Sequence, residues 1–203
     1  KVTEAFGGRA VMTRDTHQRA SDRVAEAVGK IEASSGRKMD IVVMIQGDEP
    51  MVFPEMIDMA VGPLLKEKDI FVTNLTAAIT SKKEHEDPNC IKVVVDRRFN
   101  ALYFSRQAIP SFKGPAAPLT LYKQVCIIPF KRDFLFTYSA LEPTPLEKAE
   151  SVDMLRVLEH GYKVRMVPFD LLTFSVDTPE DLVRVEALLR GDPLNAKYNA
   201  KGK

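Results

Sequence analysis

Two aspartates follow apolar, strand-like runs in distant parts of the chain. Asp48 comes shortly after the run Ile41–Ile45, in the stretch IVVMIQGDEP. Asp177 follows LLTFSV at 171–176 and precedes Thr178, a good N-cap for the next helix. Ligands of open α/β sheets bind beyond the carboxyl ends of the strands, so we expect both carboxylates in one crevice. Two carboxylates in one crevice are suitable metal ligands for Mg²⁺. This ion uses one or two carboxylates and completes its coordination shell with water and phosphate oxygens.

Each aspartate also has a structural interpretation. Gly47, Asp48, Glu49 and Pro50 together have the composition of a turn. An acid beside a Thr-Pro helix start stabilises the helix terminus, which would explain Asp177 equally well. For either aspartate alone the structural interpretation is favoured. The same arrangement of strand and acid occurs twice, however, and this repetition favours the metal.

Composition narrows the class of protein. The chain has 203 residues, enough for one α/β domain and a small subdomain. Its 29 basic and 28 acidic residues give a net charge of +1 without a basic block, which argues against nucleic-acid binding. No apolar run approaches the ~18 residues of a membrane helix, so we expect no membrane partner. Cys90 and Cys126 form no C-x-x-C pair and indicate reduced thiols in a cytoplasmic protein.

Hydrophobic periodicity and capping signals predict alternating helices and strands. Helices are expected from Ser21 as N-cap, from Pro54, from the capping box at Thr144 to about His160, and after Thr178. The expected strands are 41–45, 70–75, 91–96, 101–105, 125–130, 163–169 and 171–176. This alternation predicts an α/β fold with a mostly parallel sheet. The segment 98–143, rich in strand and proline, is expected to be a small β-rich insertion.

Six collinear blocks resemble one enzyme family. They are GGRAVMT (7–13), VVMIQGDEPM (42–51), DPNCIKVVVD (87–96), ALYFSRQAIP (101–110), PLEKAESVDMLRVLEHG (145–161) and VDTPEDLVRVEALL (176–189). Together they are similar to the 3-deoxy-manno-octulosonate cytidylyltransferases, also called CMP-Kdo synthetases. The resemblance implies a Rossmann-like nucleotidyltransferase (nucleotide-diphospho-sugar transferase) fold and a homodimer. The implied reaction, in lipopolysaccharide biosynthesis, joins CTP and an acidic eight-carbon sugar with Mg²⁺ and releases pyrophosphate.

The resemblance also implies roles for individual residues. Asp48 and Asp177 would be the catalytic metal ligands. Gln46 and Arg106 would lie near the sugar, where a guanidinium suits its carboxylate. Judged from the residues alone, Arg106 is equally well a surface arginine at a strand end. Gln124 and Asp153 would contact the sugar as well, and the cytosine would lie near Ser21, Asp22 and Arg23.

Departures from the family pattern lie in the sugar and base motifs. The family's H-L-G-I-Y-G-Y is replaced by Gln124–Phe130, its E-Q-L-R by Asp153–Arg156, and a glycine near the base by Ala20. Lost hydroxyl contacts discriminate strongly between substrates, so we expect a different, deoxygenated or aminated sugar acid. The alternatives are a shifted alignment or a changed pocket that still accepts the original sugar.

The chain begins at Lys1, without the family's S-x-R-x-P-G-K-P-L loop, so we expect these 203 residues alone to be a poor catalyst. Alternative functions are a catalytically lapsed sugar- or nucleotide-binding homologue and a nucleotidyltransferase that uses another nucleoside triphosphate. Residues 1–97 and 163–190 are expected to form the nucleotide and metal core. Residues 98–162 are expected to bind the sugar and the second subunit, and 191–203 to form a flexible tail.

Overall fold

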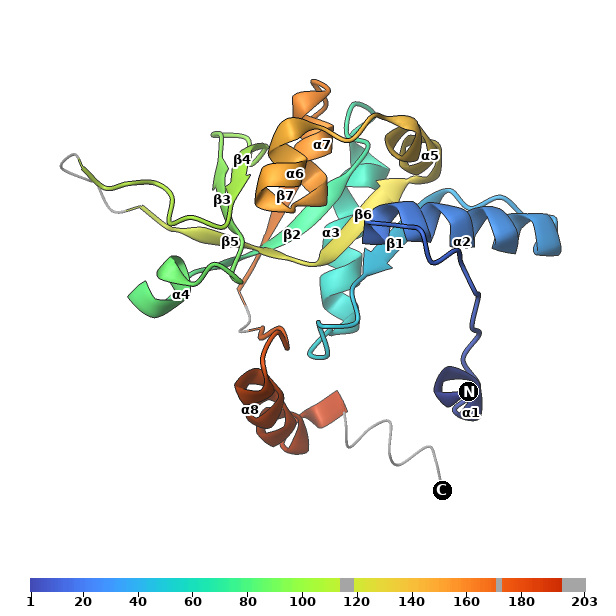
Figure 1. Ribbon diagram of the computed structural model, residues 1–203, viewed down its shortest axis with the longest axis horizontal. Helices are drawn as coiled ribbons and strands as arrows, with labels where there is room; N and C mark the ends of the chain where they lie inside the picture. Colours follow the sequence, from blue (N-terminus) through green and yellow to red (C-terminus); the bar gives the residue numbers. More distant parts are fainter. Residues whose placement is uncertain (114–118, 171–172, 195–203) are drawn as a thin grey trace.

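The computed structural model describes residues 1–113, 119–170 and 173–194 of the chain (Figure 1). Its helices are α1 (Val2–Ala5), α2 (Ala20–Ser35), α3 (Pro54–Lys66), α4 (Lys82–Glu86), α5 (Arg132–Ala140), α6 (Pro145–Glu150), α7 (Asp153–Glu159) and α8 (Pro179–Arg190). Its strands are β1 (Ile41–Ile45), β2 (Thr73–Ala78), β3 (Lys92–Val95), β4 (Ala101–Ser105), β5 (Tyr122–Val125), β6 (Ile127–Lys131) and β7 (Arg165–Phe169). None of the described helices is long and apolar enough to cross a membrane.

The strands form two sheets, and the prediction of a mostly parallel sheet is wrong. Five strands have the order β4-β3-β5-β2-β7, and β1 pairs separately with β6. Within the described residues β2 and β7 pair in parallel, whereas the other named strand pairs are antiparallel. The short connection between β3 and β4 can join only antiparallel neighbours. The strands β2 and β3, which α4 separates in sequence, are not neighbours in the sheet, because β5 lies between them.

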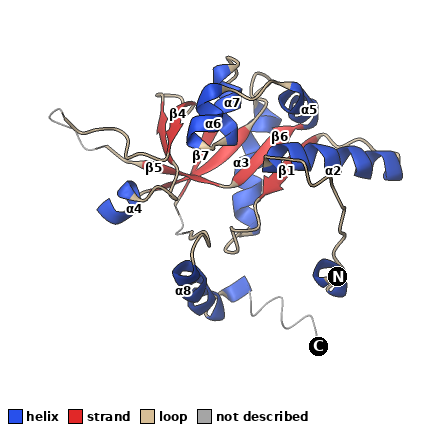
Figure 2. Cartoon of the chain, viewed as in Figure 1, coloured by secondary structure: helices blue, strands red, loops and turns tan. Residues whose placement is uncertain are grey.

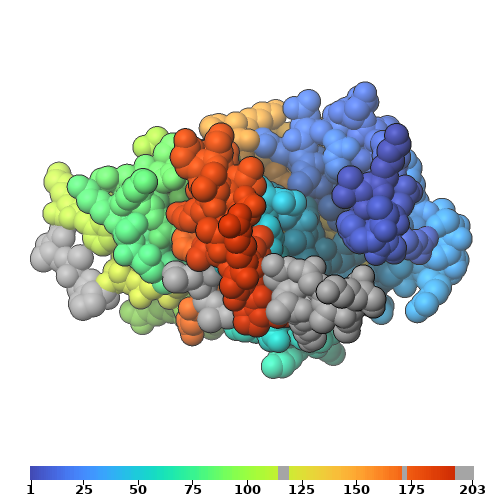
Figure 3. All heavy atoms as spheres, turned by 90° about the horizontal axis from the view of Figure 1, so that it is seen from below, coloured from blue at the N-terminus to red at the C-terminus, as the bar shows by residue number. Residues whose placement is uncertain are grey.

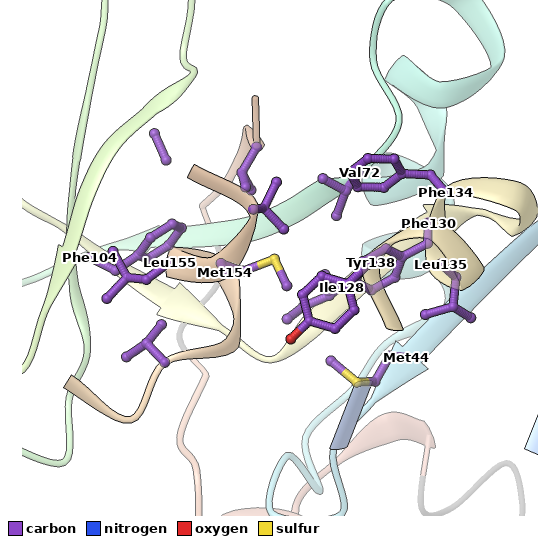
Figure 4. Packing of buried hydrophobic residues seen from close by; sticks show 14 of the residues in the cluster. Met44, Val72, Phe104, Ile128, Phe130, Phe134, Leu135, Tyr138, Met154 and Leu155 are labelled. Atoms are coloured by element: carbon purple, nitrogen blue, oxygen red, sulfur yellow. The ribbon is translucent and has the colours of Figure 1, made fainter. Parts of the chain in front are cut away.

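Helices cover the sheets and bury two hydrophobic clusters (Figure 2). The larger cluster joins the β1–β6 pair and parts of the five-stranded sheet to α2, α5 and α7. Its centre contains Met44, Phe130, Tyr138 and Met154 (Figure 4). The smaller cluster packs α3 against β2 and β5 through Met56, Ala60, Leu75 and Val125. The larger cluster thus contains residues from both sides of the predicted boundary at 98, and the division of function between the two parts stays a prediction.

Several local signals are confirmed. The α3 helix begins at Pro54, and Thr178 Oγ1 accepts a hydrogen bond from Asp181 N at the start of α8. Gly161 follows the end of α7 with φ +79°, the left-handed conformation that glycine adopts without strain. Strands β1 and β4 have the predicted bounds.

Three local predictions are wrong. Ser21 is not the N-cap of α2, because the helix begins two residues earlier than predicted, with Arg19 as the N-cap and Ala20 as the first helical residue. The helix expected to continue to His160 breaks at Ser151, whose φ is +55°. This break turns α7 back on α6, so that Arg156 Nε reaches Glu147 Oε2 at 2.8 Å.

The third concerns the strand expected at 171–176. Residues 171–172 lie outside the described residues, and 173–176 form no strand. Instead, the backbone of this segment is hydrogen-bonded to the loop that follows β1, where Val176 N donates to Asp48 O. Most of the predicted tail, 195–203, also lies outside the described residues.

Candidate active site

A cavity of about 420 Å³ lies between the loop after β1, the segment 80–91, the end of β5 and the segment before α8. Figure 3 shows the orange-red C-terminal segment across the middle of one face of the molecule, with the green segment around 80–100 on one side of it. The polar lining includes Gln46, Asp48, Glu49, Asp87, Asn89, Arg106, Lys123, Gln124 and Asp177. The cavity therefore collects carboxylates, amides and cations from segments that are far apart in sequence.

The cavity brings together Asp48 and Asp177, the two predicted metal ligands. A backbone hydrogen bond of 2.9 Å from Val176 N to Asp48 O holds their two loops together. Asp48 Oδ1 is buried and has no hydrogen-bond partner in the described part of the chain. Asp177 Oδ2 accepts a hydrogen bond of 2.8 Å from Ser175 Oγ. The predicted convergence is confirmed, although Asp177 follows an irregular segment and not a strand.

Glu49 is a cavity residue that the sequence analysis placed only in a turn. Its Oε1 accepts a hydrogen bond of 2.9 Å from Cys126 N, at the junction of β5 and β6. Burial raises the pKa of Glu49, and the neighbouring Asp48 carboxylate raises it further. Glu49 thus ties the loop that carries Asp48 to the opposite side of the cavity. Its contact lies 77 positions away in the sequence, so no local signal indicates it.

Gln46, Arg106 and Gln124, three of the four predicted sugar-binding residues, line the cavity. Arg106 makes extensive contacts with the backbone. Its Nε donates to Glu150 O at 2.7 Å and its Nη1 to Pro88 O at 2.9 Å. Each terminal nitrogen carries a second N–H, so the guanidinium keeps donors for a ligand while these carbonyls fix its position.

Lys92 supports this side of the cavity from within the protein. Its side chain is fully buried, with 0% exposure. Its Nζ donates to the carbonyl oxygens of Asp87 at 2.8 Å, Cys90 at 2.6 Å and Arg106 at 2.5 Å. Burial lowers the pKa of Lys92. One buried ammonium thus joins the segment 87–90 to Arg106, which lines the cavity.

The fourth predicted sugar ligand, Asp153, lies outside this cavity and contacts the predicted base site. Its Oδ2 accepts a hydrogen bond of 2.6 Å from the buried Ser21 Oγ. Burial raises the pKa of Asp153, although the Ser21 bond opposes that shift. Asp22 faces Arg156 at 3.2 Å, and Arg23 Nη1 donates to Thr13 Oγ1 at 2.7 Å.

Asp22 and Arg156 line a second cavity of about 430 Å³, together with Arg19 and Glu147. Arg156 Nη2 and Glu147 Oε1 form a buried ion pair at 2.7 Å, and Arg19 Nε reaches the same carboxylate oxygen at 3.1 Å. Ser21, Asp22, Arg23 and Asp153 thus do not line the cavity that contains Asp48 and Asp177.

Comparisons with known proteins agree with the family that the sequence motifs indicate. Residues 1–165 match the family described as cytidylyltransferase. A 3-deoxy-manno-octulosonate cytidylyltransferase from Syntrophotalea carbinolica is 42% identical over 199 residues, which cover 94% of this chain and 77% of the relative. The enzyme of the same name from Geobacter metallireducens is 40% identical over 195 residues, covering 91% of this chain and 74% of the relative.

Among solved structures, CMP:2-keto-3-deoxy-manno-octonic acid synthetase in complex with CTP is 36% identical, with a TM-score of 0.82. The alignment covers 93% of this chain and 75% of that chain. A glucose-1-phosphate thymidylyltransferase from Bacillus anthracis, 18% identical with a TM-score of 0.53, shares the fold. The chain belongs to the 3-deoxy-manno-octulosonate cytidylyltransferase family, the nucleotidyltransferases of the CMP-Kdo synthetase type.

Proposed function

We propose that this protein transfers CMP from CTP to the anomeric hydroxyl of an acidic, Kdo-like sugar and releases pyrophosphate. One observation carries the proposal: Asp48 and Asp177 line the same cavity, and a backbone hydrogen bond joins the two segments that carry them. Family membership supports the reaction class, and the CTP complex of the solved relative supports the nucleotide. We further propose that the protein acts in the cytoplasm. Its two cysteines suit a reducing compartment, and the lipopolysaccharide pathway that the resemblance implies agrees with this location.

Asp48 and Asp177 would hold a Mg²⁺ ion. The fit is chemical: the buried Asp48 Oδ1, without a partner in the described residues, is an acceptor that a cation would satisfy. The described residues contain no cluster of three His, Cys, Asp or Glu side chains suited to a metal. Two carboxylates alone agree with Mg²⁺, which takes its remaining ligands from water and phosphates. When bound, the ion would neutralise charge on the phosphates and orient them.

The chain's own residues would bind and orient the reactants. The anomeric oxygen forms its bond to the α-phosphorus of CTP while the bond to pyrophosphate breaks, so positioning and charge stabilisation supply most of the catalysis. Gln46 and Gln124 would face the hydroxyl groups of the sugar, and Arg106 its carboxylate, from positions on the cavity lining.

The nucleotide would use the segment with Ser21, Asp22 and Arg23, and Asp153 would support it through its bond to Ser21. In the structure these side chains bond to other protein groups, so binding a base here requires an exchange of contacts. We also propose that residues 98–162 contribute to the sugar site and to a homodimer.

Pyrophosphate release by the full-length chain tests the function. The reaction contains CTP, Mg²⁺ and 3-deoxy-manno-octulosonate, and the CMP-sugar is identified by mass spectrometry. A panel of CTP, UTP, ATP and GTP measures the nucleotide preference, for which we expect CTP. A preference for UTP would contradict the proposal. Binding of the sugar acid in a calorimeter, with no turnover of any nucleotide, would favour a catalytically lapsed binding protein instead.

A further inference from the structure

Asn74 lies beside Gln124, beneath the lining of the active-site cavity. Asn74 is on β2 and fully buried, with 0% exposure, whereas Gln124 is partly exposed on β5, the central strand of the five. The register of these antiparallel strands pairs Thr76 with Gln124. Asn74, two residues from Thr76, is therefore the diagonal neighbour of Gln124 on the same face of the sheet. Diagonal neighbours of this kind lie within reach of long side chains.

The backbone fixes the orientation of the Asn74 amide. Its Nδ2 donates to Leu75 O at 2.9 Å and to Val125 O at 2.7 Å. Carbonyl oxygens only accept hydrogen bonds, so the amino group of Asn74 must point toward them. A flipped Asn74 would place its own oxygen against two carbonyl oxygens. Its Oδ1 therefore points in the other direction, toward Gln124.

The orientation of Gln124 follows from that of Asn74. One end of the Gln124 amide lies 2.6 Å from Asn74 Oδ1. Since Asn74 Oδ1 only accepts, the group at that distance must be the donor Nε2. The other end, Oε1, accepts no hydrogen bond from any described residue, and Gln124 lines the cavity. Position 124 therefore offers the cavity a carbonyl acceptor whose orientation is set by two backbone carbonyls.

We propose that Asn74 is a positioning residue that holds Gln124 as a hydrogen-bond acceptor and thereby selects a sugar acid with a donor at that point. The donor is a hydroxyl or an ammonium group of the sugar. A sugar that has neither group at the position facing Gln124 binds more weakly. This inference rests on the proposed function, because it assumes that the cavity takes an acidic sugar. It adds that specificity depends on a buried residue that does not line the cavity.

The test measures binding of 3-deoxy-manno-octulosonate and of analogues that each lack one of its hydroxyl groups, by calorimetry with the full-length chain. For the wild type we expect one analogue to bind about tenfold more weakly, the value of one hydrogen bond that is lost. In Asn74→Leu that ratio should fall below about twofold, because Gln124 is free to rotate. Gln124→Met should have the same effect and changes a partly exposed side chain, so it serves if Asn74→Leu does not fold.

The matched control is Thr76→Val. Thr76 is also fully buried on β2, and its hydroxyl donates to Lys123 O at 2.6 Å across the same pair of strands. Thr76 lies directly opposite Gln124 in the register, and this variant removes its bond to the backbone while the bond between Asn74 and Gln124 stays in place, so the tenfold ratio should persist. Loss of the ratio in Thr76→Val would overturn the inference, as would an unchanged ratio in folded Asn74→Leu, an unchanged ratio in Gln124→Met, or the absence of any discrimination in the wild type.

Pyrophosphate release by the same proteins separates this inference from the proposed function. Turnover without any discrimination among hydroxyl groups overturns the inference and leaves the function standing. Discrimination in binding that Gln124→Met abolishes supports the inference, even where no nucleotide is turned over and the function fails.

Discussion

Lys92→Met tests how the cavity is held together. The variant keeps the length and the apolar part of the side chain and removes the ammonium, which donates to three backbone carbonyls at 2.5 to 2.8 Å. Hydrogen bonds to charged groups contribute about 1.5 to 3 kcal/mol each, or about 6 kcal/mol for the three. Burial of an ammonium costs several kcal/mol, and the variant recovers that part. We expect a net loss of about 3 kcal/mol in the free energy of unfolding.

Urea denaturation followed by circular dichroism measures this loss, and thermal unfolding should shift by about 6 to 12 °C for a chain of this size. The control is Lys123→Met. Lys123 is the partner of Lys92 in the β3–β5 register, but its Nζ bonds to Glu84 Oε1 in a partly exposed ion pair. Lys123 Nζ also donates to Thr173 O at 3.2 Å, but water reaches both side chains of the pair, so we expect a smaller loss of about 1 to 2 kcal/mol. A loss below about 1 kcal/mol in Lys92→Met, or equal losses in the two variants, would refute the reasoning.

Further predictions concern stability at two ion pairs. Arg156 and Glu147 are almost fully buried, and two nitrogens of the one bond to two oxygens of the other. Arg156→Met should therefore lower the free energy of unfolding, measured by urea denaturation, by about 3 to 5 kcal/mol. A loss below about 1 kcal/mol would contradict this expectation. The Arg132 guanidinium beside Glu32 lowers the pKa of that carboxyl to about 2. Because the folded pKa lies below the unfolded value, this pair stabilises the protein above about pH 4.5, and the contribution is lost as pH falls toward 2. Glu32→Gln should therefore flatten the pH dependence of the melting temperature in that window, and an unchanged acid slope would count against the pair.

Local signals in the sequence predicted local structure well. The proline and threonine at the starts of α3 and α8 fix helix ends through their own backbone and side-chain chemistry. The break at Ser151 had no such signal, because the apolar spacing continues through it. The bidentate contact between Arg156 and Glu147 stabilises the folded-back arrangement, and these residues meet only because α7 turns back on α6.

The candidate site was predicted in part. Asp48 and Asp177 each carry a local signature, and the resemblance gave Gln46, Arg106 and Gln124, which the structure places in the same cavity. The supporting residues could not be predicted. Asn74 and Glu49 act through contacts 50 and 77 positions away, and these depend on strand register and loop docking. Sheet topology was missed for the same reason, since hydrophobic periodicity identifies strands and leaves their partners open.

The central claim is that Asp48 and Asp177 hold the ion on which CMP transfer depends. The direct measurement is Mg²⁺-dependent pyrophosphate release from CTP and a sugar acid by full-length Asp48→Asn and Asp177→Asn. Asp133→Asn, at a side chain that is 89% exposed, is the control. We predict a loss of about 100-fold or more in each active-site variant, with wild-type stability because asparagine keeps the shape of aspartate. Full activity in both variants, at wild-type Mg²⁺ concentrations, would contradict the account.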